Sequence, residues 1–231
     1  MSSYVVATIK DWHIKQFHEN SNQLNGNWHL ITSPDVLSID NMRQLAPEYI
    51  FFPHWSWLVP EEILNEFNCV CFHMTDVPYG RGGSPLQNLI IRGHKKTMLT
   101  ALKMEKALDS GPIYLKVPLS LKGSAQEIYS ESAKLIIVMM KTIATIMPEP
   151  LSQEGPVELF KRRSPKQSEL PNSVKLEQLY DHIRMLDADT YPKAFLNFGN
   201  FKLEFNQAQM DNDHILKATV TITNKGTSSD D

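Results

Sequence analysis

Short apolar runs near the start of the chain alternate with segments whose apolar positions recur at helical spacing. The runs predict strands over residues 4–9, 28–32, 49–52 and 69–72. The intervening segments predict helices over residues 11–19, 38–45 and 60–67, the first opened by Asp11 as its cap. Strands that alternate with crossover helices require a mostly parallel sheet covered on both faces, so the pattern predicts an α/β fold.

The pattern becomes irregular after this region. Glycine and proline crowd residues 76–85, which predicts a loop, and residues 109–112 predict a second turn. Further helices are predicted over residues 86–92, 125–146 and 174–186, and further strands over residues 97–104 and 113–117. The polar, proline-rich stretch 151–173 predicts an extended surface segment.

Two alternating runs, 201–206 and 215–223, predict a β-hairpin joined through residues 210–213. We therefore expect one domain over residues 1–195, followed at 196–231 by this hairpin and a tail, 226–231, that is disordered. Because an isolated hairpin is only marginally stable in water, we expect its apolar side to be buried. That side carries Phe201, Leu203, Phe205, Ile215, Val220 and Ile222.

Composition narrows the class of protein. With 231 residues, 42% of them hydrophobic and 21% charged, the chain can bury a sizeable core, which excludes a disordered or fibrous protein. The net charge of −3 provides no overall cationic field for nucleic acid or an anionic membrane. The longest apolar run, residues 135–140, is too short to cross a bilayer, and the N-terminus lacks a leader pattern. We therefore expect a cytoplasmic protein.

Two loop residues are candidates for proton transfer. His73 follows one predicted strand and Asp109 precedes another, and loops at strand ends are where a parallel sheet presents reactive groups. A histidine paired with a carboxylate can transfer protons near neutral pH. The alternative is structural: a capping histidine and an aspartate that stabilises its own turn.

Cysteine chemistry offers a second alternative. Cys69, Cys71 and His73 would leave one face of a strand, and thiolate and imidazole are zinc ligands. No second Cys pair or His-x-x-x-His follows, so the two cysteines are predicted to be buried hydrophobes and no metal is expected. No dinucleotide or P-loop motif is present. The aromatic run 51–57 can be core or the wall of a pocket, and the basic run 161–163 a solvated surface or a phosphate contact.

Several motifs lie in order between residues 73 and 112. They are His73-Met-Thr-Asp-Val-Pro78, Arg81-Gly82, Pro85, Thr100, Met104 and Leu108-Asp-Ser-Gly-Pro112. Together, and with Asp109 36 positions after His73, they resemble the formyltransferases that use N10-formyltetrahydrofolate. The resemblance covers about residues 1–205. It implies the Rossmann-like formyltransferase fold, with a mostly parallel central sheet and a short C-terminal hairpin extension, and N-formyltransferase activity.

The resemblance also implies roles for three residues in catalysis. His73 would stabilise the oxyanion that develops on the formyl group, and Asp109 would orient its imidazole and help move the amine proton. The family pattern is Asn-x-His, whereas this chain has Cys71 at the Asn position. A thiol is a weak hydrogen-bond donor, so either another donor replaces the Asn or the strand register differs.

The cosubstrate implied by the resemblance is N10-formyltetrahydrofolate, with no metal. Its pterin would lie between the loop that carries Trp55, Trp57, Leu58 and Val59 and the turn formed by Leu108 and Asp109.

The amine substrate follows from a narrower resemblance. The stretches 162–165, 183–184 and 192–195, and the form of the motif after His73, are similar to sugar N-formyltransferases of pseudaminic acid pathways. A UDP-linked 4-amino-trideoxyhexose is the expected substrate, and a homodimer the expected assembly. The implied substrate contacts are Arg81, Gly82, Arg162, Arg163 and Arg184. Methionyl-tRNA, another small amine such as glycinamide ribonucleotide, and a non-catalytic folate- or nucleotide-sugar-binding protein are the alternatives.

Overall fold

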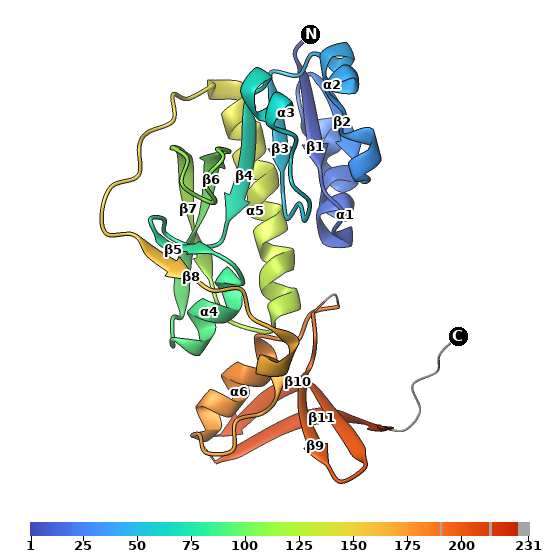
Figure 1. Cartoon of the computed structure of the whole chain (residues 1–231), viewed down its shortest axis with the longest axis vertical. Coiled ribbons are helices and arrows are strands. Elements are labelled where there is room, and N and C mark those ends of the chain that lie inside the picture. Colours follow the sequence, from blue (N-terminus) through green and yellow to red (C-terminus); the bar gives the residue numbers. More distant parts are fainter. Residues whose placement is uncertain (190, 213, 226–231) are drawn as a thin grey trace. The chain divides into compact units, whose positions relative to one another are not determined.

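A six-stranded sheet organises the first part of the computed structural model (Figure 1). Its order is β2-β1-β3-β4-β6-β7; β1 pairs parallel with β2 and β3, β3 parallel with β4, and β4 antiparallel with β6. The strands are β1 Ser3–Ala7, β2 Asn27–Ile31, β3 Tyr49–Phe52, β4 Cys69–His73, β6 Lys96–Lys103 and β7 Ile113–Ser120. The expected α/β fold with a mostly parallel sheet is confirmed.

The structure describes residues 1–189, 191–212 and 214–225, and the chain divides into two units. The sheet unit comprises Met1–Gly82, Thr97–Leu119 and Tyr129–Leu159. The C-terminal unit comprises Gly83–Lys96, Ser120–Ile128 and Phe160–Asp231. The predicted tail, 226–231, lies outside the described residues, as does Asp213 in the predicted hairpin connection. None of the described helices is long and apolar enough to cross a membrane.

Helices connect the parallel strands as predicted. They are α1 Asp11–Asn20, α2 Ile39–Leu45 and α3 Glu61–Glu66, with short 3₁₀ turns η1 Ser21–Gln23 and η2 Pro34–Val36. Ser38 caps α2 by accepting a hydrogen bond from the Asn41 N–H. The predicted Asp11 cap is wrong: Lys10 is the N-cap, and Asp11 lies in the first turn, where its charge still favours the helix dipole.

Alternation along the strands gives the sheet two covered faces. One face contributes Val5, Ile50 and Phe52 to a core that includes Met42 of α2 and Ile63 of α3. The other face carries a row of stacked rings, Tyr4, Trp28, Phe51 and Phe72. The long helix α5, Ala125–Ile146, reaches β1 through the hydrogen bond from Tyr4 Oη to the Ala144 carbonyl.

Two short strands lie where the sequence predicts irregular chain. β5, Tyr79–Gly82, falls within the predicted loop and pairs with β8, Glu158–Phe160, within the predicted extended segment. Runs of three or four residues rich in glycine or charge carry no alternating pattern, so the sequence does not reveal them.

The C-terminal unit holds a three-stranded antiparallel sheet of order β11-β10-β9 (Figure 1). Its elements are α4 Pro85–Ile91, η3 Pro165–Ser168, α6 Leu176–Arg184, β9 Ala194–Phe198, β10 Phe201–Asn212 and β11 Ile215–Asn224. The predicted hairpin is β10 with β11, but β9 was missed. The domain boundary after residue 195 stays a prediction and falls inside β9.

The expected burial of the hairpin's apolar side is only partly met. Leu203 and Phe205 are partly buried, whereas Ile222 is 62% exposed and Phe201, Ile215 and Val220 are also exposed. Burial of these four against a second subunit stays a prediction; within one chain, the third strand adds hydrogen bonds at the edge without covering the face of the sheet.

Candidate functional site

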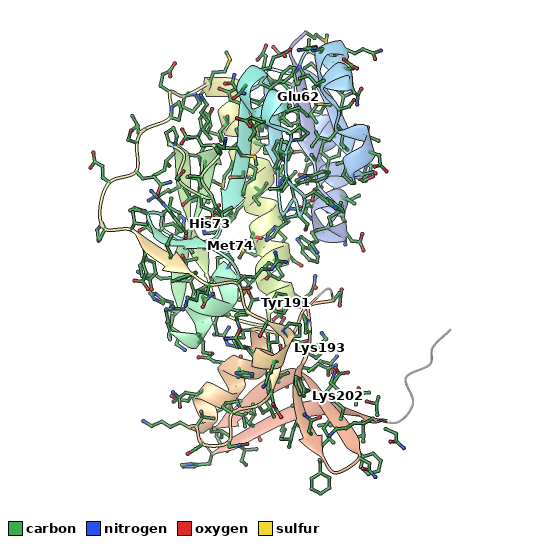
Figure 2. All side chains as sticks on the ribbon, in the orientation of Figure 1. Glu62, His73, Met74, Tyr191, Lys193 and Lys202 are labelled. Carbon is green, nitrogen blue, oxygen red and sulfur yellow. The ribbon has the colours of Figure 1, made fainter. Side chains whose placement is uncertain are left out.

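His73, labelled in Figure 2, is the last residue of β4. The residue is 7% exposed, and its Nε2 lies 2.8 Å from the carbonyl oxygen of Gly80. A carbonyl oxygen only accepts, so Nε2 must carry a proton. Thr75 Oγ1 donates to the same carbonyl at 3.3 Å, and Gly80 adopts φ +77°, a conformation that favours glycine. The ring is therefore fixed by the loop that follows it.

Asp109 faces the other ring nitrogen. Its Oδ2 lies 3.5 Å from His73 Nδ1 and accepts the Gly82 N–H at 2.9 Å. The two side chains are 8% and 10% exposed, so their interaction is little screened by water. Asp109 itself has φ +51°, which aspartate tolerates better than most residues. The structure thus brings together His73, Gly82 and Asp109 as the motif predicts.

Gln153 joins the same site, and sequence reasoning missed it. Its Nε2 donates to the carbonyl oxygens of Asp109 and Gly111, each at 2.8 Å. Its Oε1 accepts two hydrogen bonds from Arg81, from Nε at 3.0 Å and from Nη2 at 2.8 Å. Arg81, predicted to contact substrate, therefore donates to Gln153. Gln153 has no recognisable pattern around it, since it lies in the irregular segment after α5.

Gly111 is required where the turn meets β6. A Cβ at this position would lie 1.9 Å from the carbonyl oxygen of Lys103, far inside van der Waals contact. The glycine in the Asp109-Ser-Gly-Pro112 motif is thus explained by close approach of two backbone segments.

Cys69 is buried and Cys71 partly buried. Burial raises the pKa of Cys69 to about 12 and that of Cys71 to about 12, and for Cys71 the nearby Asp109 carboxylate raises it further. Neither is a thiolate near neutral pH, and Cys71 packs against the core cluster while still facing the charge of Asp109. Among the described residues no cluster of three or more His, Cys, Asp or Glu is arranged to hold a metal.

The predicted folate loop exposes apolar side chains. Leu58 is 97% exposed and Trp57 45%, while Trp55 packs edge-on against Trp57 with 5.0 Å between ring centroids. Val59 packs on the core below them. In the predicted partner turn, Leu108 is 71% exposed. Lys106 Nζ lies 3.6 Å from Glu61, which brings the turn and the end of this loop together.

The three C-terminal arginines differ in availability. Arg162 is exposed; Arg163 donates from its backbone N–H to Ser84 Oγ, and its buried Nε has no hydrogen-bond partner among the described residues. Arg184 is 4% exposed and donates to Asp181, Leu121 and Gly123. A substrate phosphate would have to displace these internal contacts of Arg184. The three lie in the C-terminal unit, and Arg81 and Gly82 in the sheet unit.

A histidine pair, with His13 buried and His54 partly buried, was also not predicted from the sequence. His13 Nε2 and His54 Nδ1 are 2.7 Å apart, where one ring donates and the other accepts. Burial is the main cause that lowers the pKa of His54 to about 4 and the pKa of His13 well below its ordinary value. His54 lies two residues after the end of β3, and its place in the aromatic run was the only signal that we found in the sequence.

A cavity of about 450 Å³ lies beside the loop that follows His73, and none of the predicted site residues lines it. Its walls are Asp76, Val77, Pro78, Tyr79, Lys116, Glu154, Pro156, Val157 and Glu158.

Comparison with known proteins supplies the decisive observation. Residues 165–223 match the family model described as "Methionyl-tRNA formyltransferase, C-terminal domain". A solved structure, the methionyl-tRNA formyltransferase from Clostridium thermocellum, is 44% identical, with a TM-score of 0.93 over 97% of this chain and 100% of that one. The chain belongs to the formyltransferase family. The fold implied by the resemblance is confirmed. The expected class of protein is confirmed as well, since the formyltransferase family consists of enzymes that transfer formyl groups.

The chain is also similar, at lower sequence identity, to other formyltransferases. The methionyl-tRNA formyltransferase of Francisella philomiragia is 28% identical over 84% of this chain, which spans 64% of that relative's length. A sugar N-formyltransferase from Shewanella sp FDAARGOS_354 is 14% identical, with a TM-score of 0.68 over 92% of this chain and all of that one, and shares the fold.

Proposed function

We propose that this chain transfers the formyl group of N10-formyltetrahydrofolate to a primary amine. The observation that carries the proposal is the buried pair of His73 and Asp109, with Nδ1 and Oδ2 3.5 Å apart at the end of a sheet strand. In the reaction the amine nitrogen bonds to the formyl carbon, the bond from that carbon to N10 breaks, and the proton lost by the amine is passed on to N10.

His73 and Asp109 divide this chemistry. His73 donates its Nε2 proton to the oxygen of the formyl group, in place of the Gly80 carbonyl, as negative charge develops there. The Asp109 carboxylate keeps acceptor capacity beyond the Gly82 N–H, so it can orient the imidazole and take the amine proton. Cys71, a neutral thiol, contributes a weak donor beside them.

The folate loop suits a flat heterocycle. Trp57, Leu58 and Leu108 offer exposed apolar surface, and covering such surface is favourable on binding.

Substitution of the pair tests the proposal. We expect His73→Ala and Asp109→Asn each to lower kcat about 100-fold or more, because oxyanion stabilisation and proton transfer each contribute on that scale. Asparagine keeps an acceptor for the Gly82 N–H and tolerates the positive φ of residue 109. Release of tetrahydrofolate is the measurement.

His18→Ala, on the exposed surface of α1, is the matched control and should retain full activity. Near-normal turnover by either site variant, with an unchanged circular dichroism spectrum, would refute the assignment.

For the amine, we propose a nucleotide-linked amino sugar, a UDP-linked 4-amino-trideoxyhexose of the pseudaminic acid type. Arg162 is exposed, so its guanidinium can donate to a diphosphate, whereas the buried Nε of Arg163 would first have to be uncovered. Four cations of the C-terminal unit are already paired with its own carboxylates, which weakens their attraction for an RNA backbone. The pairs are Arg184–Asp181, Lys193–Asp187, Lys202–Glu204 and Lys217–Asp211.

Methionyl-tRNA is the second candidate. It is favoured by the family-model match over residues 165–223 and by the 44% identity to a protein named methionyl-tRNA formyltransferase. Turnover should be measured with both amines at several salt concentrations. Activity only on charged tRNA, falling steeply with salt, would overturn the sugar proposal. Tight folate binding without turnover of either amine would indicate a binding protein.

A further inference from the structure

We propose that Gln153 is the residue that positions Asp109, and that Arg81 acts through Gln153 instead of on the substrate. The inference rests on the proposed formyl transfer and adds a positioning residue to that site. It starts from one amide side chain that joins three separate parts of the chain: Arg81 on β5, the Asp109 turn, and the segment after α5.

Four hydrogen bonds of ordinary length connect Arg81, Gln153 and the Asp109 turn, and we call this arrangement the brace. The Gln153 amide nitrogen lies 2.8 Å from each of the Asp109 and Gly111 carbonyl oxygens. The guanidinium of Arg81 holds the amide oxygen from two nitrogens, at 3.0 and 2.8 Å. A two-pronged contact fixes the plane of the amide, and the amide in turn fixes two carbonyls of the turn.

The turn needs such support because its own contacts are few. Within it, Ser110 bonds only to the Ala107 carbonyl, at 2.8 Å through Oγ and 3.4 Å through its N–H. Asp109 is held at φ +51°, and Gly111 lies against Lys103 with no room for a side chain. A small rotation of this backbone would carry the carboxylate away from both His73 and the Gly82 N–H.

An amide side chain is suited to this position because it must accept from Arg81 and donate to the carbonyls of Asp109 and Gly111. Glutamine offers an acceptor to Arg81 and donors to the two carbonyls, whereas glutamate offers acceptors alone and lysine donors alone. Gln153→Glu would therefore strengthen the contact with Arg81 while setting a carboxylate oxygen against two carbonyl oxygens. This variant separates support of the turn from simple pairing with Arg81.

The first experiment measures steady-state formyl transfer. We expect Gln153→Ala and Gln153→Glu to lower kcat about 10- to 100-fold, the scale set by a small misplacement of a reacting group, with KM for both substrates within about threefold. Gln16→Ala, whose amide bonds to Glu19 on the exposed side of α1, is the control and should leave kcat unchanged. Full kcat in Gln153→Glu would overturn the proposal.

A double-mutant cycle tests the role of Arg81. If Arg81 acts through Gln153, Arg81→Ala lowers kcat in the wild-type background but has little further effect in Gln153→Ala. Independent losses that add, or a rise in KM confined to the amine substrate, would show that Arg81 binds substrate and would overturn this part.

Hydrogen exchange provides a readout that does not need activity. We expect the Gly82 amide, which donates to Asp109 Oδ2, to exchange at least tenfold faster in Gln153→Ala than in the wild type. Unchanged exchange would refute the brace even if the wild-type enzyme proved inactive. Conversely, faster exchange with no turnover by the wild type would uphold the brace and reject the proposed function.

Discussion

At the scale of single residues, Cys71 shows how the type of side chain limits the hydrogen bonds that the site can offer. A thiol is a weaker hydrogen-bond donor than the imidazole of His73. Burial keeps the Cys71 thiol protonated, with a pKa of about 12. Its position, two residues before His73 on the same strand face, is the one the family fills with asparagine.

Cys71 can therefore be exchanged as a test of this reading. We expect Cys71→Ser to stay within about threefold of wild-type kcat, because a hydroxyl replaces one donor by another. Cys71→Asn should be tolerated and equal or exceed the wild-type rate, since an amide is the stronger donor. Thermal unfolding serves as the control: collapse of both variants would show that Cys71 acts only in packing.

The pair of His13 and His54 makes stability depend on pH. In the folded protein the pKa of His54 is lowered to about 4. Above pH 7 the His54 imidazole is therefore mostly uncharged in both the folded and the unfolded protein. As the pH falls from about 6.5 to about 4, the unfolded chain binds protons first, and folding stability decreases. Each unit of pKa difference is worth about 1.4 kcal/mol, so we expect a loss of a few kcal/mol.

Urea unfolding at pH 7.5 and pH 5 measures this loss. His54→Asn, which accepts the φ of +51° at this position, should flatten the dependence on pH. A wild-type midpoint equally high at both values would contradict the prediction.

At the scale of elements, the Asp109 turn packs closely against the end of β6, where the backbone of Gly111 lies next to the Lys103 carbonyl. We expect Gly111→Ala to cost about 1–3 kcal/mol or more, because its Cβ would meet the Lys103 carbonyl at 1.9 Å and one of the two segments must move. Activity should fall as well, since the displaced turn carries Asp109. Chemical denaturation checks the cost; an unchanged midpoint for Gly111→Ala would disprove the steric argument.

Elements with long patterns were the predictable ones. The strand at residues 49–52 and the helix at residues 125–146 match β3 and α5, because four buried residues or many helical turns leave a clear signal. β9 was missed although apolar residues and Gly199 mark a second hairpin there. His73 and Asp109 were found from their motif, whereas Gln153 acts through contacts that no local pattern records.

On the scale of the molecule, the exposed face of the C-terminal sheet bears on assembly. Phe198 is 69% exposed and Ile222 62%, and both lie on the face shared with Leu203. An apolar group of this kind favours association, so we propose a homodimer formed through this face.

Light scattering at micromolar concentration tests the dimer. The wild type should have about twice the 26.4 kDa mass of the chain, and Ile222→Lys should shift it to the monomer. Thr221→Lys, on the opposite face, should not. A wild-type mass near 26.4 kDa would exclude the dimer.

The division of the chain also has a consequence for biosynthesis. The sheet unit is built from three stretches, and its last one ends only at Leu159, after two excursions into the C-terminal unit. A ribosome delivers residues in order, so β1 to β4 emerge long before β6, β7 and most of α5 can complete their sheet. Until β6 follows, the nascent strand β4, which ends in His73, has one unpaired edge, and an unpaired strand edge favours pairing with other chains.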